Sequence, residues 1–190
     1  MKETGILFTP EMSRKIDRGE KTQTRRIIKP TANCPYGQVG DFLYVKEPFI
    51  VTGFHVMKKP QRQISGIYLR DQKSFSVELT EEEHKKWISW KYPTGKGKSS
   101  LFMFKSLARL WLEITRISVE KLQDITDEQI QAEGVEVPQS VKDAARYMRS
   151  EYDCVDWDWR DGFRELWDSI WESNPLVWVI EFKKRQDGVT

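Results

Sequence analysis

The stretch Gly19-Glu20-Lys21-Thr22-Gln23-Thr24-Arg25-Arg26 decides how this sequence is interpreted, because it gathers cations and hydroxyls within eight residues. Its second half predicts the start of a strand, and side chains alternate between the two faces of a strand. One face is expected to carry Thr22, Thr24 and Arg26, and the other Gln23 and Arg25. Lys21 lies at the turn before the strand, where its long stem can reach either face. Such a group of donors suits a phosphate, a carbonyl oxygen or the edge of a base.

The segments on either side of this stretch predict an alternation of helices and strands. Thr9 and Pro10 favour the start of a short helix that Gly19 ends, and the residues from Thr126 form a capping box that opens a helix ending at Gly134. Further helices are expected at 80–87, 141–152 and 162–172, strands at 24–28, 41–52, 64–69, 108–119 and 176–182, and a mobile basic loop at 93–100. This order favours an α+β fold with a small barrel over repeated βαβ units.

Length and charge are compatible with one folded domain. The chain has 190 residues and eight tryptophans, which suits a packed core. We expect a single domain over residues 1–190, with insertions at about 53–104 and 136–160. The net charge is only +2, but basic residues gather at 14–29 and acidic residues at 150–172. A ligand responds to such local charge rather than to the total.

Several classes of protein do not fit the composition. The two cysteines, Cys34 and Cys154, and the two histidines have no spacing typical of a disulfide framework or a zinc site. We therefore expect neither a metal nor another cofactor. No signal peptide is recognisable, and no apolar run approaches the ~20 residues that span a membrane. The expected location is the cytoplasm, without membrane partners, and the sequence does not indicate an oligomeric state.

Four segments together resemble the ASCH domain, a member of the PUA-like superfamily. They are Gly19 to Arg26, Gly40-Asp41-x-Leu43-x-Val45, Leu122 through Gly134, and Val177-Trp178-Val179-Ile180-Glu181-Phe182. The resemblance covers roughly residues 4–50 and 105–183, in the family's order. It implies a PUA-like (ASCH) β-barrel with peripheral helices, and RNA or a modified, cytidine-like nucleoside as the ligand.

A longer pattern is similar to ASCH proteins common in phages and prophages, which implies a phage-derived protein acting in the bacterial host cell. This pattern adds Cys34-Pro35-Tyr36-Gly37, Val45-Lys46-Glu47 and Phe163 through Ile170. Because such proteins mostly lack an assigned function, a non-catalytic accessory or interaction role stays open beside ligand binding.

Over its core the chain is also similar to the small N4-acetylcytidine amidohydrolases, which leaves the question of an enzyme open. By position, the family's catalytic lysine matches Lys21, its nucleophilic threonine Thr24, its glutamate Glu133 and its motif arginine Arg26. A threonine hydroxyl needs a neighbouring base, and a lysine serves as one only when burial or a nearby cation lowers its pKa. The chain departs from the family at Arg25, where those hydrolases carry an apolar residue, and in its two insertions.

Two further residues are candidates for ligand contacts. Glu47 follows a strand, so it is expected either to face the same cavity as Lys21 or to form an ion pair with Lys21 or Arg26. Arg109 is a candidate ligand residue that could extend a phosphate-binding track, and the alternative is a basic group that only aids solubility. The neighbouring cations in that track are Lys96, Lys98 and Lys105.

Overall fold

The computed structural model describes residues 1–29, 33–56, 62–89, 94–138 and 158–185. The chain divides into two compact units. The first unit comprises Met1–Arg14, Asp41–Glu113 and Lys184–Thr190, and the second comprises Lys15–Gly40 and Ile114–Lys183. The expectation of a single domain with two insertions stays a prediction.

Helices and strands are both present, so the expected α+β class is confirmed, and the PUA-like barrel stays a prediction. The strands are β1 (Glu3–Leu7), β2 (Gln23–Ile27), β3 (Phe42–Lys46), β4 (Phe49–Val56), β5 (Arg62–Tyr68), β6 (Ser74–Glu78), β7 (Gly97–Lys98), β8 (Trp111–Lys121) and β9 (Leu176–Lys184). The α-helices are α1 (Pro10–Arg18), α2 (Glu81–Ser89), α3 (Asp127–Ala132) and α5 (Trp159–Glu165). The 3-10 turns are η1 (Ser100–Phe102), η2 (Lys105–Leu107), η3 (Leu122–Asp124) and η4 (Asp168–Ser173).

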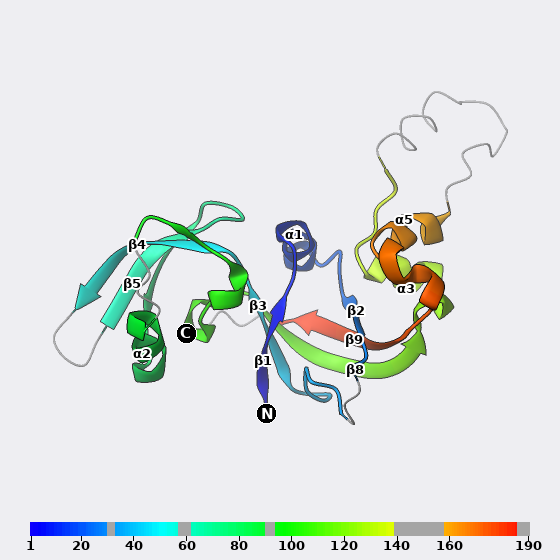
Figure 1. Ribbon diagram of the computed structural model, residues 1–190, viewed down its shortest axis with the longest axis horizontal. Coiled ribbons are helices and arrows are strands. Elements are labelled where there is room, and N and C mark those ends of the chain that lie inside the picture. Colours follow the sequence, from blue (N-terminus) through cyan, green and yellow to red (C-terminus); the bar gives the residue numbers. More distant parts are fainter. Residues whose placement is uncertain (30–32, 57–61, 90–93, 139–157, 186–190) are drawn as a thin grey trace. The chain divides into compact units, whose positions relative to one another are not determined.

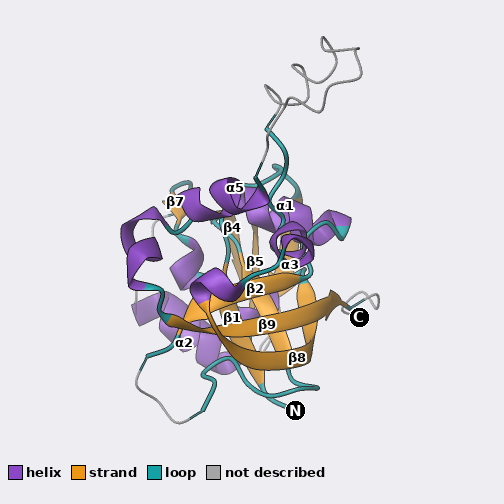
Figure 2. Ribbon diagram, turned by 90° about the vertical axis from the view of Figure 1, so that its right-hand side faces the viewer, coloured by secondary structure: helices purple, strands orange, loops and turns teal. Residues whose placement is uncertain are grey.

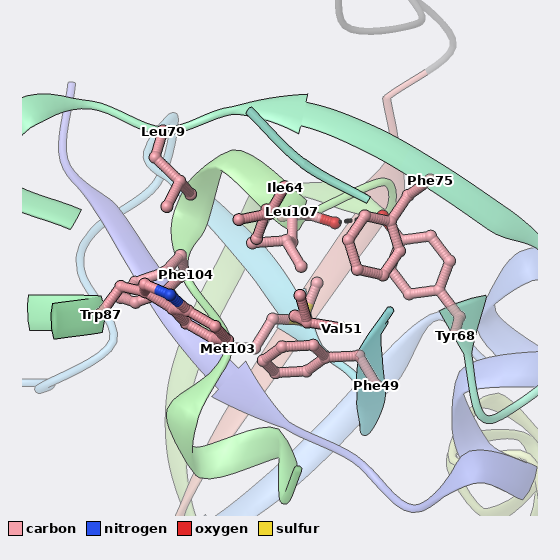
Figure 3. Packing of buried hydrophobic residues seen from close by; sticks show 11 residues of the cluster. Phe49, Val51, Ile64, Tyr68, Phe75, Leu79, Trp87, Met103, Phe104 and Leu107 are labelled. Carbon is pink, nitrogen blue, oxygen red and sulfur yellow. Dashed lines mark hydrogen bonds between the residues drawn. The ribbon is translucent and has the colours of Figure 1, made fainter. Parts of the chain in front are cut away.

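The first unit packs a four-stranded sheet around an aromatic core. Its strands follow the order β6-β5-β4-β7, and all the neighbouring pairs are antiparallel. The core side chains come from these strands, from α2 and from the segment before β8 (Figure 3). Tyr68 donates its hydroxyl to the Leu107 carbonyl at 2.6 Å, which satisfies the polar end of a buried ring. In the same unit β1 runs parallel to β3, and β3 pairs antiparallel with the start of β8.

In the second unit β9 lies between β8 and β2, and α3 packs against α5 (Figures 1 and 2). Val177 and Val179 of β9 form a buried cluster with Ile130 of α3 and Phe163 of α5. Because β2 and β9 pair antiparallel with Arg25 opposite Val179, Arg25 shares the sheet face that the two helices cover.

Local signals for the short helices are confirmed. The Thr9 hydroxyl accepts the Met12 N–H at 3.2 Å, and α1 ends where Gly19 takes a φ of 78°. At α3 the capping box of Thr126 and Gln129 is complete, and Gly134 follows with a φ of 81°. The strands expected at 24–28, 64–69, 108–119 and 176–182 and the helix at 80–87 correspond to β2, β5, β8, β9 and α2.

Other expectations were wrong in detail. The strand expected at 41–52 is two strands, β3 and β4, separated at Pro48, since proline has no N–H to continue a ladder. The expected loop at 93–100 contains β7, which pairs with Phe49 and Ile50 of β4. The helix expected at 162–172 is α5 followed by the separate turn η4, and β1 and β6 were not anticipated. The helix expected at 141–152 lies outside the described residues.

Candidate functional site

The centre of the second unit holds a buried ionic network between β2 and α3. The Lys21 ammonium donates to the Glu133 carboxylate at 2.7 Å (Nζ to Oε2) and to the Glu133 carbonyl at 2.6 Å. Arg25 donates to the other carboxylate oxygen of Glu133 at 3.2 Å. The side-chain exposure is 3% for Lys21, 0% for Arg25 and 7% for Glu133. One carboxylate thus pairs with both buried cations, and charges removed from water require such a partner.

Arg25 extends this network toward the first turn of α3. Its second terminal nitrogen donates to Glu120 Oε2 at 3.2 Å and to Gln129 Oε1 at 3.0 Å, and its guanidinium lies 5.8 Å from the centre of the Phe163 ring. The same Gln129 oxygen accepts the Thr126 N–H of the capping box at 3.0 Å. The cap that starts α3 therefore also positions an acceptor for Arg25.

The C-terminal end of α3 is held by donors from α1 and from the turn before β2. The Thr22 N–H donates to the Ala132 carbonyl at 2.9 Å, and the Lys15 ammonium donates to the Gly134 carbonyl at 2.7 Å. The last carbonyls of a helix lack partners within the helix and carry partial negative charge, so cations are favoured there. These bonds bring Lys21 beside Glu133, 112 residues later in the sequence.

Burial lowers the pKa of Lys21 below its ordinary value, because the ammonium has lost its solvating water. The negative charge and hydrogen bond of Glu133 oppose this shift, whereas the positive charges of Arg26 and Arg25 reinforce it. A lysine with a lowered pKa in a charged, buried setting has the property that a general base needs.

A pocket of about 370 Å³ opens beside the network in the same unit. It is lined by Thr22, Gln23, Thr115, Glu128, Gln129, Ala132, Glu181 and Phe182. We call it the Gln23 pocket, because the Gln23 side-chain nitrogen is buried there without a hydrogen-bond partner. Glu181 at its wall accepts a hydrogen bond from Arg116 at 3.3 Å. A buried amide donor without a partner is rare in folded proteins.

The structure brings Lys21 and Glu133 together as the sequence suggested, and it adds Arg25 to them. The expected alternation along β2 holds, since Arg25 is paired with Val179 and Thr24 with Ile180, on the other face of the sheet. The proposed grouping of Lys21, Thr24, Arg26 and Glu133 in one cleft stays a prediction, and Glu133 meets β2 on the face that carries Arg25. Thr22 lines the Gln23 pocket, and the functional roles of all these residues stay predictions.

Glu47 and Arg109, the remaining candidates, pair with each other in the first unit. Arg109 donates to both carboxylate oxygens of Glu47, at 2.8 and 3.1 Å, and Arg70 lies 2.8 Å from the same carboxylate. The Arg109 guanidinium also donates to Asp71 and lies 3.9 Å from the centre of the Tyr68 ring. The structure thus gives Glu47 an ion pair with Arg109 and Arg70.

Sequence reasoning missed the parts of the site that only packing brings in. Gln23 was assigned to the unused face, and neither Glu120 nor Gln129 was proposed as a site residue. Gln129 could have been found from its place in the capping box, where its side chain is held beside the helix start. Glu120 has no comparable signal, since it follows from the register of β8 alone.

Two classes of feature are missing from the described part of the chain. No group of three or more His, Cys, Asp or Glu side chains among the described residues is placed to hold a metal ion. Among the same residues, no helix has the length and apolar character needed to cross a membrane.

No protein-family model matches this chain, and no curated protein matches it. Among solved structures, it is similar to an ASCH domain from Lactobacillus crispatus JV V101, with 11% sequence identity and a TM-score of 0.41 over 96% of this chain and 79% of that chain. It is also similar to a protein from Enterococcus faecalis V583 described under the family model DUF984, with 9% identity and a TM-score of 0.40 over 100% of this chain and 86% of that chain.

Proposed function

We propose that the second unit binds a cytidine-like nucleoside, free or within RNA, in the Gln23 pocket. The observation that carries this proposal is the Gln23 amide nitrogen, which is buried at the pocket wall and has no hydrogen-bond partner. An unsatisfied buried donor costs about 1–3 kcal/mol. A ligand that accepts this hydrogen bond removes the cost, and a site built in this way discriminates strongly against ligands that cannot accept it.

The polar groups around Gln23 favour a base that carries an amino group. A glutamine amide presents a donor and an acceptor side by side, which matches the ring nitrogen and neighbouring amino group of cytosine. The carboxylates of Glu128 and Glu181 line the same pocket and can accept from amino hydrogens. Acidic walls disfavour a phosphate inside the pocket, so the base, and not the backbone, is the group that enters. The volume of about 370 Å³ lies within the range of small-ligand pockets.

The ionic network holds residues that line the Gln23 pocket in position. Gln129 lines the pocket and also accepts a hydrogen bond from Arg25, which Glu133 holds in turn. Lys21 and Thr22 tie the strand that carries Gln23 to the end of α3. The network therefore holds the Gln129 side chain and the backbone next to Gln23 in position, which lowers the cost of ordering them when a ligand binds.

Gln23→Met is expected to weaken binding of a short oligocytidine RNA by about 10-fold, because methionine fills a similar space but offers no donor to the base. The affinity is measured by fluorescence anisotropy, with an oligouridine of the same length as the ligand control. Gln131→Met is the matched variant, since Gln131 is exposed on the same helix as Gln129. Equal affinity for the two RNAs, or an unchanged affinity in Gln23→Met, would contradict the proposal. Repeating the titration across salt separates phosphate contacts from base contacts.

Hydrolysis of an N4-acyl group from cytidine is a second candidate, favoured by one observation. Lys21 is buried beside Glu133 and its pKa is lowered, which is the property that a general base needs. In this scheme Thr24 is the nucleophile. The substrate and the base must then meet the Thr24 hydroxyl on the face of β2 opposite Arg25.

Incubation with N4-acetylcytidine, followed by chromatography of released cytidine, tests this second candidate. We expect turnover to fall to the uncatalysed rate in Lys21→Met and Thr24→Val, because each removes one partner of the nucleophile–base pair. Lys29→Met, at an exposed lysine of the same segment, serves as the control. Turnover that persists in the first two variants rules the mechanism out. Absence of both turnover and RNA binding leaves a non-catalytic accessory role, as expected for the phage-type proteins.

A further inference from the structure

The first unit contains a second and larger pocket, which plays no part in the proposed function. Its volume is about 610 Å³, and it is formed by β3, α2, η1, η2 and the start of β8. The rings of Tyr44 and Trp111 lie together at its wall, with their centres 5.7 Å apart. Leu101, Met103 and Phe104 supply further apolar lining. We call this cavity the Tyr44 pocket. Two adjacent aromatic rings beside apolar side chains offer a surface on which a planar ring can stack.

Three lysines line the same cavity. Lys46 donates to the Leu101 carbonyl at 2.6 Å, and burial lowers its pKa. Lys105 lies 5.9 Å from the centre of the Trp111 ring and pairs with Glu3, and Lys86 pairs with Glu82. An ammonium has three donors, so each of these lysines has the capacity to bind an anion as well.

Two acidic side chains, Glu82 and Glu83, also line the pocket; Glu82 pairs with Lys86, and Glu83 is bonded by the fold. Glu83 accepts the Ser106 N–H at 3.0 Å and the Thr80 N–H at 3.0 Å, and it also accepts from the Ser106 hydroxyl. Burial by itself raises the pKa of Glu83. The hydrogen bonds from Ser106 and Thr80 outweigh this effect and lower the pKa, so the carboxylate stays ionised. These bonds join α2 to η2 and satisfy the Glu83 carboxylate internally, and Glu82 is paired with Lys86, so Lys46 and Lys105 are the cations proposed to meet an anion.

A glycine keeps this arrangement in place. Gly5 of β1 lies opposite Tyr44 of β3, and a Cβ atom at Gly5 would lie 2.8 Å from Tyr44 Cζ and 2.9 Å from Lys46 Cδ. Both side chains therefore lie across the glycine, in space that any other residue would fill. The positions of one ring and one cation of the pocket depend on this absent side chain.

We propose that the Tyr44 pocket binds a planar aromatic ring that carries an anionic group, as a nucleoside 5′-monophosphate does. The ring stacks on Tyr44 and Trp111, and the anion is bound by Lys46 and Lys105. The cavity is large enough for such a ligand, since ligand pockets span about 300–1,000 Å³. Neither the aromatic rings nor the lysines alone specify this ligand; their presence in one cavity does.

Titration of the whole protein with uridine 5′-monophosphate, followed by calorimetry, tests the proposal. Lys46→Gln and Lys105→Gln are each expected to weaken binding by about 10-fold, since each removes a charged hydrogen bond to the anion. Lys85→Gln is the matched control, because Lys85 lies on α2 beside Lys86 and pairs with Glu81 outside the pocket lining. Gly5→Ala is expected to weaken binding while the protein stays folded, because only the ends of Tyr44 and Lys46 must move. Unchanged affinity in both lysine variants would overturn the proposal.

Ligands that carry only one of the two recognised groups test the ring and the anion separately. Uridine alone and inorganic phosphate alone are each expected to bind at least about 10-fold more weakly than the nucleotide, because each lacks one of the two recognised groups. Equal binding of either one overturns the proposal. Benzoate also carries a ring and an anion, so it tests the source of the ligand. Tighter binding of the nucleotide favours a nucleotide, and tighter binding of benzoate favours an aromatic carboxylate.

Discussion

Glu133→Leu is expected to lower the free energy of unfolding by about 3–5 kcal/mol, the cost typical of leaving a buried charge unpaired. Glu133 is the carboxylate that Lys21 and Arg25 share, and both cations are almost fully buried. Arg25 keeps its bonds to Glu120 and Gln129 in the variant, but Lys21 loses the negative charge beside its ammonium. The expected response of Lys21 is to release its proton at a lower pH than in the parent protein.

Urea denaturation followed by circular dichroism measures this effect. Glu136→Gln is the control, because Glu136 forms an ion pair with Lys15 at 3.1 Å but its side chain is 57% exposed. Exposed pairs contribute about 0–1 kcal/mol, so this variant is expected to stay close to the parent. The double variant Lys21→Met, Glu133→Leu is expected to recover part of the loss, since it removes both charges of one pair. If Glu133→Leu loses no more stability than Glu136→Gln, the network does not support the fold as described.

Gly66→Ala is expected to destabilise the first unit by about 3 kcal/mol or more, the upper end of the cost of overpacking. A Cβ atom at Gly66 would lie 2.0 Å from the backbone oxygen of Ile50 and 2.6 Å from Phe75 Cζ. The first of these atoms belongs to the backbone of the neighbouring strand, so no side-chain rotation relieves the clash. The strands β4 and β5 must separate at this point, next to the irregular register between Val51 and Gly53.

Thermal and urea unfolding of Gly66→Ala, compared with Gly97→Ala, tests this prediction. Gly97 lies in the same sheet, on β7, but a Cβ atom there meets only Leu69 Cδ1 at 3.6 Å, an ordinary contact. The control is therefore expected to change stability by less than about 1 kcal/mol. Similar stabilities for the two variants would show that the sheet adapts at Gly66 without cost.

The ends of short elements could be predicted from sequence because their causes are local. The Thr9 cap, the Gly19 stop and the capping box at Thr126 each depend on residues within one turn of the chain. The position of β2 followed from the same stop. The break between β3 and β4 also had a local cause in Pro48, and it was missed because the apolar pattern continues through it.

The sequence by itself determined the two short helices with their caps, the alternation of β2, and the identity of the lysine and glutamate that meet. Which face of β2 those residues occupy was decided by tertiary structure. α3 packs on the face of Arg25, so Arg25 pairs with Glu133, and Gln23 lines the pocket. Alternation divides a strand into two faces but does not say which one a helix more than 100 residues away will cover. That choice follows from the burial of Ile130 and Phe163 against β9.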